Sequence, residues 1–252
     1  MIEDGYIPPP PVARVRDAVS RRGVVPVLTH LARWSGQWLA GLPLTAGRFE
    51  SSAGRFSLAG RSYPYLFHRH KHSWLTERTV EVPVVQTVVD DARARGGRIL
   101  EVGNVLSHYR PQTHLVVDKY ERAPGVVNRD ALELTDLGMF DLIVAISTLE
   151  HVGHDELPRE PGKALRAALA LQAMLAPGGE LVITLGVGYN AAFDAELRDG
   201  SLSRSRITAM RRVGDGRRWR EVPADEVWSA PYDFLLYAAG GVVFVLAEAA
   251  AD

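Results

Sequence analysis

The sequence contains no cysteine among its 252 residues. This excludes a disulfide framework, a thiolate nucleophile and a cysteine-ligated metal, and it fits the reducing cytoplasm, where we expect the protein to reside. Lysine is scarce, with Lys71, Lys119 and Lys163 only, and the formal net charge is −1. The broad basic field that a nucleic-acid backbone attracts is therefore absent, and we expect no nucleic acid as a partner.

The protein also lacks long uninterrupted runs of apolar residues. Its most apolar early segment, residues 24–44, is interrupted by Pro26, His30 and Arg33, which makes it too polar to cross a bilayer. The first residues are acidic and rich in proline rather than basic and apolar, unlike a secretory signal. We expect no membrane as a partner.

The first 80 residues are expected to form an extension of helices and a hairpin, and residues 81–252 an α/β domain. Residues 7–12 are expected to be extended. Residues 13–40 are helix-like, with a break near Gly23 to Pro26, and residues 54–70 alternate as in a short hairpin. Residues 73–95 have the pattern of a capped helix, which Pro83 is expected to divide into two segments.

From residue 98 onward, short β-rich runs alternate with segments long enough for turns or helices. The runs are "RILEVG", "HLVVDKY", "GVVNRDAL", "FDLIVAIS" and "GGELVITLGVG", and "PGKALRAALALQAMLAPGG" is the clearest helix. This alternation predicts a parallel sheet with covered faces. Residues 205–222 and 237–249 are expected to add an antiparallel edge.

Polar residues follow the ends of these predicted strands. They are Glu101, Asp118, Asp130, Ser147 with Glu150 and His151, and Tyr189 with Asn190. In open α/β sheets, ligands bind outside the carboxyl ends of the strands. One such acid alone is better explained as a solvated strand end or a helix cap, but the repetition at successive ends favours a ligand site.

In order and spacing, "ILEVGNVLSHY", "HLVVDKYE", "VVNRDALEL", "FDLIVAISTLEHVG" and "MLAPGGELVITL" resemble the successive motifs of class I S-adenosylmethionine-dependent methyltransferases. The resemblance covers roughly residues 97–190. It implies a Rossmann-like, mostly parallel sheet of seven strands with helices on both faces, and an antiparallel C-terminal edge hairpin. It also implies S-adenosylmethionine as cofactor.

The resemblance assigns parts of the cofactor to particular residues. Glu101, Gly103 and Asn104 would form the turn against the methionine moiety, Asp118 with Lys119 would meet the ribose, Asp130 with Ala131 the adenine edge, and Ser147 the floor beside the sulfonium. Members of the family usually carry two or three glycines in the first turn, whereas this turn keeps only Gly103. Val105 is therefore expected to restrict the approach of the backbone to the cofactor.

Methyl transfer from a sulfonium is an in-line displacement, so the protein positions the acceptor and removes its proton. His151, with Glu150 beside it, is the candidate base for a hydroxyl on a small molecule such as a sugar or secondary metabolite. His151 could instead hydrogen-bond its own loop. Candidate acceptor contacts are Tyr65, His68, Trp74, Arg78, Tyr189 and Asn190. The first four could equally dock the N-terminal helices on the sheet.

Two sets of residues suggest a metal. His68, His70 and His72 alternate, but no carboxylate completes the set, so a basic aromatic loop is favoured. Asp155, Asn190 and Asp194 could support Mg²⁺, although helix caps and surface acids explain them as well.

Two alternatives share the predicted sheet. A nicotinamide-dependent oxidoreductase needs a three-glycine fingerprint that "GNVLSHY" does not supply. The second alternative is a protein with the methyltransferase fold that has no activity and serves as a binding or scaffold subunit. Val105 supports this alternative because it restricts the turn where the cofactor would bind. A homo-oligomer is compatible with the sequence, which does not determine the oligomeric state.

Overall fold

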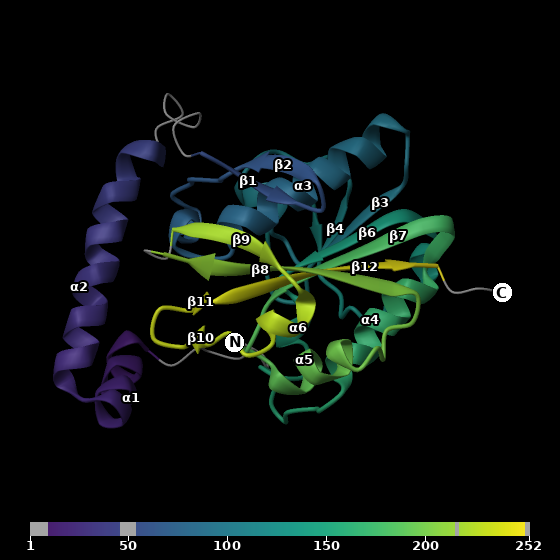
Figure 1. The fold of residues 1–252 in the computed structure, drawn as a ribbon. Coiled ribbons are helices and arrows are strands. Elements are labelled where there is room, and N and C mark those ends of the chain that lie inside the picture. Colours follow the sequence, from purple (N-terminus) through teal and green to yellow (C-terminus); the bar gives the residue numbers. More distant parts are fainter. Residues whose placement is uncertain (1–9, 46–53, 215–216, 250–252) are drawn as a thin grey trace.

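A computed structural model describes residues 10–45, 54–214 and 217–249 (Figure 1). Residues 7–9 of the expected extended segment lie outside these ranges, whereas residues 11 and 12 already belong to α1, so the extended expectation is wrong there. The helices are α1 (Pro11–Arg22), α2 (Val24–Gly41), α3 (Arg78–Ala94), α4 (Lys163–Ala173), α5 (Ala191–Arg198) and α6 (Ala224–Val227). Short 3₁₀ turns are η1 (Leu42–Thr45), η3 (His70–Leu75), η4 (Leu106–His108), η5 (Thr135–Leu137) and η6 (Leu149–His151).

The main sheet has eight strands in the order β5-β4-β3-β6-β7-β12-β8-β9. Their bounds are β3 (Ile99–Val102), β4 (Leu115–Val117), β5 (Val126–Val127), β6 (Phe140–Ile146), β7 (Leu175–Gly186), β8 (Ser205–Val213), β9 (Arg218–Val222) and β12 (Gly241–Glu248). Strands β3 to β7 pair in parallel, and β12 lies antiparallel between β7 and β8. The predicted parallel sheet with an antiparallel C-terminal edge is confirmed, and β9 extends it by one strand beyond the expected seven.

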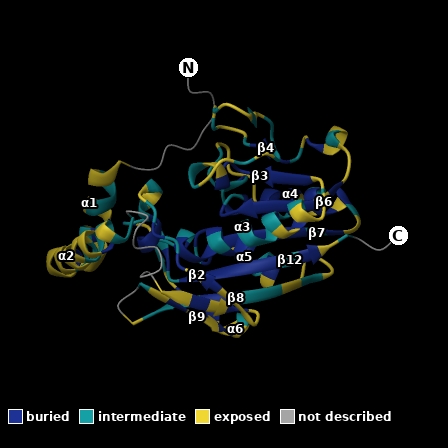
Figure 2. Ribbon diagram, turned by 90° about the horizontal axis from the view of Figure 1, so that it is seen from above, coloured by how far each residue is buried: buried dark blue, intermediate teal, exposed yellow. Residues whose placement is uncertain are grey.

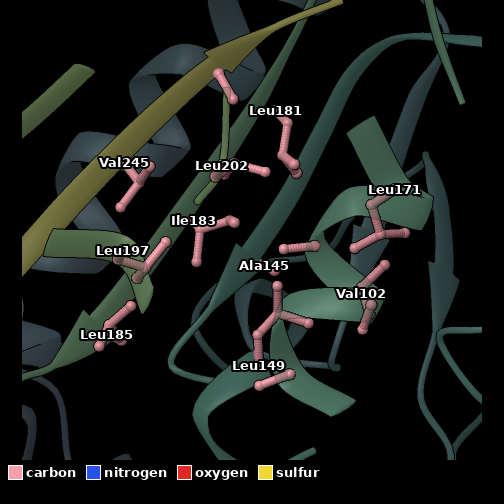
Figure 3. Close-up of a cluster of buried hydrophobic side chains, with 14 of the residues drawn as sticks. Val102, Ala145, Leu149, Leu171, Leu181, Ile183, Leu185, Leu197, Leu202 and Val245 are labelled. Carbon is pink, nitrogen blue, oxygen red and sulfur yellow. The ribbon is translucent and has the colours of Figure 1, made fainter. Parts of the chain in front are cut away.

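Helices cover both faces of this sheet. On one face, α4 and α5 pack on alternate residues of the central strands, such as Val102, Ala145 and Ile183 (Figure 3). On the other face, α3 packs on β3 and β6 through residues including Val85 and Val89. Because both faces are covered, every residue of β3 is buried, and in β6 only Asp141 is exposed (Figure 2).

The hairpin of β1 (Arg55–Leu58) and β2 (Arg61–Pro64) lies on the α3 side of the sheet. Its Phe56 and Tyr63 share a buried cluster with Met210 and Phe244 of the sheet. The second small hairpin, β10 (Tyr232–Asp233) with β11 (Ala238–Ala239), precedes β12. Together these hairpins flank the antiparallel half of the sheet.

Helix α3 is continuous through Pro83, so the expected division into two segments is wrong. Proline cannot donate the hydrogen bond that the Thr79 carbonyl would receive within the helix. The Leu66 amide donates to that carbonyl instead, at 3.0 Å, and the Thr79 hydroxyl donates to the Leu66 carbonyl, also at 3.0 Å. The backbone following β2 therefore compensates for the proline.

Helices α1 and α2 stand beside the sheet, next to the β10–β11 hairpin (Figures 1 and 2). The break between them falls at Gly23, within the expected interval. Ala18 of α1 and Val27 of α2 are buried with Leu235 of the hairpin. Among the residues that the structure describes, no helix has the length and apolarity needed to span a membrane.

Candidate active site

The first turn after β3 is held from inside by Glu101, which is fully buried. Its Oε1 accepts hydrogen bonds from the amides of Val105 and Leu106, both at 2.8 Å. Its Oε2 lies 2.9 Å from His114 Nε2. The carboxylate therefore shapes the turn rather than facing outward from it.

Gly103 has a φ of +87°, a conformation that favours glycine, and a Cβ at this position would overlap the Thr148 side chain. The next amide, of Asn104, donates to Asp118 Oδ2 at 3.0 Å, and Asn104 Nδ2 donates to Glu121 Oε1 at 2.7 Å. The turn is thus bonded directly to the end of β4. Where a helix would continue the fold after this turn, there is only η4, three residues long.

Asp118 ends β4 and accepts three backbone hydrogen bonds in the described structure. Besides the Asn104 amide, the amides of Tyr120 and Glu121 donate to Oδ1 at 2.8 and 2.7 Å. A carboxylate offers about four acceptor positions. Its orientation is therefore fixed, while Oδ2 retains capacity for one further donor.

Asp130 lies in a network of four charges. Lys119 and Lys163 contact its Oδ2 at 3.0 and 3.2 Å, and both lysines also contact Glu156, at 2.9 and 2.6 Å. Burial alone would raise the pKa of Asp130, but the Leu132 amide and the lysines hold it below its ordinary value. The carboxylate stays ionised beside Ala131, and any ligand here must share it with two lysines.

Ser147 at the end of β6 is bonded to α3 underneath the strand end. Its hydroxyl donates to Glu81 Oε1 at 2.8 Å. Arg78 Nη1 lies 3.1 Å from Glu81 Oε2 and donates to the Ile146 carbonyl, also at 3.1 Å. Burial raises the pKa of Glu81, and Arg78 opposes that rise. Arg78, an expected acceptor contact, therefore lies at the strand end as part of a buried ion pair.

His151 and Asp155 form a hydrogen-bonded pair just beyond β6. The distance from His151 Nδ1 to Asp155 Oδ2 is 2.5 Å, and the Tyr189 hydroxyl donates to the same oxygen at 2.7 Å. The rings of His151 and Tyr189 lie 4.6 Å apart. Because Nδ1 faces a carboxylate, Nε2 is the nitrogen able to accept a proton, and the side chain is 45% exposed.

Glu150 is 3% exposed, and its Oε2 has no hydrogen-bond partner among the described residues. Burial raises its pKa to about 7. Asn190 Nδ2 donates to the Glu150 carbonyl at 3.0 Å, and Asn190 Oδ1 caps α5 by accepting from the Phe193 amide at 3.2 Å. The structure thus brings Glu150, His151, Tyr189 and Asn190 together.

Aromatic residues from the β10–β11 hairpin cover this group. The Tyr232 ring lies 5.1 Å from the Tyr189 ring and 4.9 Å from that of Phe234, while Tyr237 lies 6.5 Å from Tyr189. This aromatic cover was not predicted, although the three aromatic residues of "YDFLLY" in the sequence indicate it.

The expected acceptor contacts Tyr65 and Trp74 do not lie with the strand-end residues. Both are buried beneath the β1–β2 hairpin. The Tyr65 hydroxyl bonds the Trp219 backbone at 2.9 and 3.2 Å, and Trp74 Nε1 donates to the Gln37 carbonyl at 3.3 Å. His68 packs on Tyr109, 5.2 Å between rings, above the segment that follows the first turn.

The three alternating histidines are not on one face. His70 stacks on His108 at 4.1 Å, and His72 accepts a hydrogen bond from Trp38. Their segment is a 3₁₀ turn with positive φ at two residues, rather than an extended strand. Nowhere in the described ranges do three or more His, Cys, Asp or Glu side chains gather as a metal ion would require.

The expected Mg²⁺ ligands have other partners. Asp155 bonds His151 and Tyr189, Asn190 caps α5, and Asp194 accepts from the Gly188 amide at 2.7 Å. The structure therefore gives no support to a Mg²⁺ site at these residues.

The strand-end side chains fit the chemistry of S-adenosylmethionine. That molecule carries a cationic sulfonium and ammonium and a ribose diol that donates hydrogen bonds. The described edge carries carboxyl groups at Asp118, Asp130 and Glu150. Asp118 Oδ2 retains acceptor capacity, whereas Asp130 is paired with two lysines and Glu150 is buried. Gly103 adds no side chain to the turn. Cationic groups and hydroxyl donors are the partners that such carboxylates bind.

No protein-family model matches the chain, and no curated protein matches it. Several solved structures are similar to it in fold. A glycopeptide N-methyltransferase complexed with S-adenosylhomocysteine is 11% identical, covering 73% of this chain and 99% of that one, with a TM-score of 0.40. A TehB-like methyltransferase from Corynebacterium glutamicum is 17% identical, covering 64% and 85%, with a TM-score of 0.39.

A magnesium protoporphyrin IX methyltransferase from Synechocystis PCC 6803 is 14% identical, covering 66% of this chain and 78% of that one, with a TM-score of 0.36. The strand order carries the structural assignment: parallel strands flank the point between β3 and β6 where the order reverses, and antiparallel β12 is inserted beside β7. The chain has a Rossmann-like α/β fold with an antiparallel strand inserted near one edge, as the resemblance to class I S-adenosylmethionine-dependent methyltransferases implies.

Proposed function

We propose that the protein is an S-adenosylmethionine-dependent methyltransferase that methylates a hydroxyl group on a small molecule. The observation that carries this proposal is the His151–Asp155 pair, placed at the end of β6 on the edge that presents carboxylates for a cationic cofactor. We further propose that it acts in the cytoplasm on a free metabolite.

The bound cofactor would supply the methyl group. Asp118 would accept a hydrogen bond from a ribose hydroxyl through the remaining acceptor position of Oδ2. Three backbone amides already hold this carboxylate in a fixed orientation. Asp130 and Ala131 would meet the adenine, and Gly103 would lie against the methionine portion.

His151 would remove the acceptor's proton through Nε2. Asp155 keeps Nδ1 as the donor and stabilises the imidazolium that forms, while Tyr189 fixes Asp155 by a 2.7 Å hydrogen bond. The acceptor hydroxyl becomes nucleophilic as it loses its proton. The aromatic ring of Tyr189 lies beside the base, with the Tyr232 ring packed against it, and these rings would shield one side of the acceptor.

The short turn after β3 argues against the nicotinamide-dependent oxidoreductase. A dinucleotide pyrophosphate binds at the N-terminus of a helix that opens from a glycine-rich turn. Here the turn leads into three residues of 3₁₀ structure. S-adenosylmethionine carries no phosphate. The lack of that helix therefore removes less of a binding site for S-adenosylmethionine than of one for a dinucleotide.

A non-catalytic binding protein of the same fold is the second candidate. Two observations favour it. Two lysines form ion pairs with Asp130, and the Thr148 side chain fills the space next to Gly103. Both reduce the room for a cofactor at the strand ends.

Calorimetric titration with S-adenosylmethionine and S-adenosylhomocysteine separates these candidates. We expect micromolar binding that Asp118→Ala loses. A folded protein that binds neither compound refutes the methyltransferase proposal and favours the non-catalytic one.

For the base, His151→Ala should lower turnover by about 10²–10⁴-fold and leave the cofactor dissociation constant unchanged. Asp155→Asn should lower turnover too, since it removes the charge that stabilises the imidazolium. His154→Ala, in the same loop, is the matched control. Unchanged turnover in His151→Ala would remove this residue from the mechanism.

A further inference from the structure

Helix α2 is apolar on more than one side. On its inner side, Val27 is buried with Leu235 of the β10–β11 hairpin. Trp34 and Trp38 pack against the buried cluster beneath the β1–β2 hairpin. A surface helix normally turns charged residues toward water, but α2 contains no Asp, Glu or Lys and a single Arg, Arg33, in 18 residues. Its outward side is therefore almost without charge.

The outward side of α2 carries a stripe of residues at alternating spacings of three and four: Val25, Leu28, Ala32, Ser35 and Leu39. All five positions are exposed, and the large side chains of Val25, Leu28 and Leu39 are 73%, 60% and 61% exposed. Figure 2 shows α2 at the edge of the molecule, with exposed residues along its length. This spacing is that of residues through which two helices pack side by side. No element in the described part of the chain covers the stripe.

The size of the side chains changes along the stripe. Its middle is small, with Ala32 and Ser35 and, beside them, Gly36. A Cβ at Gly36 would meet no atom of the described residues within 4 Å. Larger side chains stand toward the two ends, with Val25 at one and Leu39 at the other. Two crossing helices are closest at one point and diverge on either side of it, so this order of sizes fills the space between them.

The stripe is complementary to itself when a second α2 runs in the opposite direction. Val25 and Leu39 are each seven residues from Ala32, and Leu28 and Gly36 are each four residues from it. With a two-fold axis at Ala32, Val25 of one chain would lie opposite Leu39 of the other, and Leu28 would lie opposite Gly36. A two-fold interface requires the same surface on both chains. A second copy of the chain therefore meets this requirement.

A membrane surface is the other partner that an exposed apolar helix can bind, and the residues of α2 favour it less. Helices that lie in a membrane interface turn Trp, Phe and Leu toward the lipid. In α2, Trp34 and Trp38 face the protein instead. The centre of the outward stripe is formed by Ala32 and Ser35, which bury little area in lipid. Small side chains at the centre fit the close approach of a second helix.

We propose that two copies of the chain form a symmetric dimer in which their α2 helices cross antiparallel at Ala32. This proposal does not depend on the proposed function. A contact between two single helices is smaller than the interface of a permanent dimer, so dimerisation should be reversible, with a dissociation constant in the micromolar range.

Sedimentation equilibrium of the full chain tests the oligomeric state. The mass should rise from the 27.7 kDa of one chain toward twice that value as the concentration is raised from about 1 to 100 μM. Leu28→Glu should weaken dimerisation about tenfold or more, because each carboxylate would lose water against the apolar partner helix.

Leu169→Glu is the matched control for this variant. It makes the same change at an exposed leucine of α4, on the other side of the molecule (Figure 1). It should dimerise like the wild type. Circular dichroism checks that each variant retains the fold.

Disulfide crosslinking tests the direction and register of the two helices. The chain contains no cysteine, so an introduced cysteine can bond only to one in another copy. Ala32→Cys places two thiols next to the axis and should crosslink under mild oxidation. Val25→Cys alone should not, whereas a mixture of Val25→Cys and Leu39→Cys should. Leu169→Cys gives the level of crosslinking that random collision produces.

A chain that remains a monomer over this concentration range would overturn the proposal. If that monomer binds vesicles of phosphatidylcholine and phosphatidylglycerol, and Leu28→Glu abolishes the binding, the stripe is a membrane-binding surface instead. A dimer that Leu28→Glu leaves intact would place the interface elsewhere on the molecule. Crosslinking of Val25→Cys alone, as strong as that of Ala32→Cys, would refute the antiparallel arrangement.

Discussion

Substituting Glu150 by Gln tests the electrostatics at the centre of the site. The carboxyl is 3% exposed, and burial raises its pKa from 4.5 to about 7. One pH unit corresponds to about 1.4 kcal/mol, so ionising Glu150 costs about 3 kcal/mol more in the folded than in the unfolded protein. Below pH 4.5 the group is protonated in both states and this cost is absent.

The sign of the pH dependence follows from these values. Between about pH 4.5 and 7 the unfolded chain ionises Glu150 while the folded chain keeps the proton, so stability falls as pH rises. Above pH 7 the loss stays near its full value. Gln cannot ionise, so Glu150→Gln should match the wild type near pH 4 and exceed it by up to about 3 kcal/mol at pH 8.

Urea unfolding of both proteins from pH 4 to pH 8 measures this difference directly. Other carboxyl groups titrate equally in both proteins and cancel in the comparison. Glu226→Gln, at an exposed position, is the control and should show no such trend. The reasoning is refuted if the stability gap does not widen between pH 5 and 8, or if Glu150→Gln is the less stable protein at pH 8.

Three further changes have defined expectations. Gly103→Ala forces an alanine into a φ of +87° and against Thr148, so the free energy of unfolding should fall by about 2 kcal/mol or more; a thermal midpoint equal to the wild type would contradict the packing described. Trp74→Ala empties a site that is 1% exposed and should cost about 3–5 kcal/mol in urea unfolding, without changing the cofactor dissociation constant. Dialysis against a chelator should leave methyl transfer unchanged; lost activity that Mg²⁺ restores would show a metal requirement.

The central strands could be predicted because burial on both faces requires nearly continuous apolar runs. "ILEV" is apolar except for Glu101, and "FDLIVAI" is apolar except for Asp141. The continuity of α3 could not. It depends on the Leu66 amide, from the segment after β2, donating to the Thr79 carbonyl, and nothing near Pro83 in the sequence indicates that contact. A single proline was therefore given more weight than its tertiary surroundings allow.

In the site, too, contacts between residues close in the sequence could be predicted, whereas contacts between distant residues could not. The place of His151 follows from the strand before it. Its partner Asp155 is four residues further on, the spacing at which side chains meet in a helical turn, and that spacing was a signal for a histidine and carboxylate pair rather than a metal ligand. The cover by Tyr232 could not be foreseen, because it requires the β10–β11 hairpin to fold back over residues some 80 positions earlier.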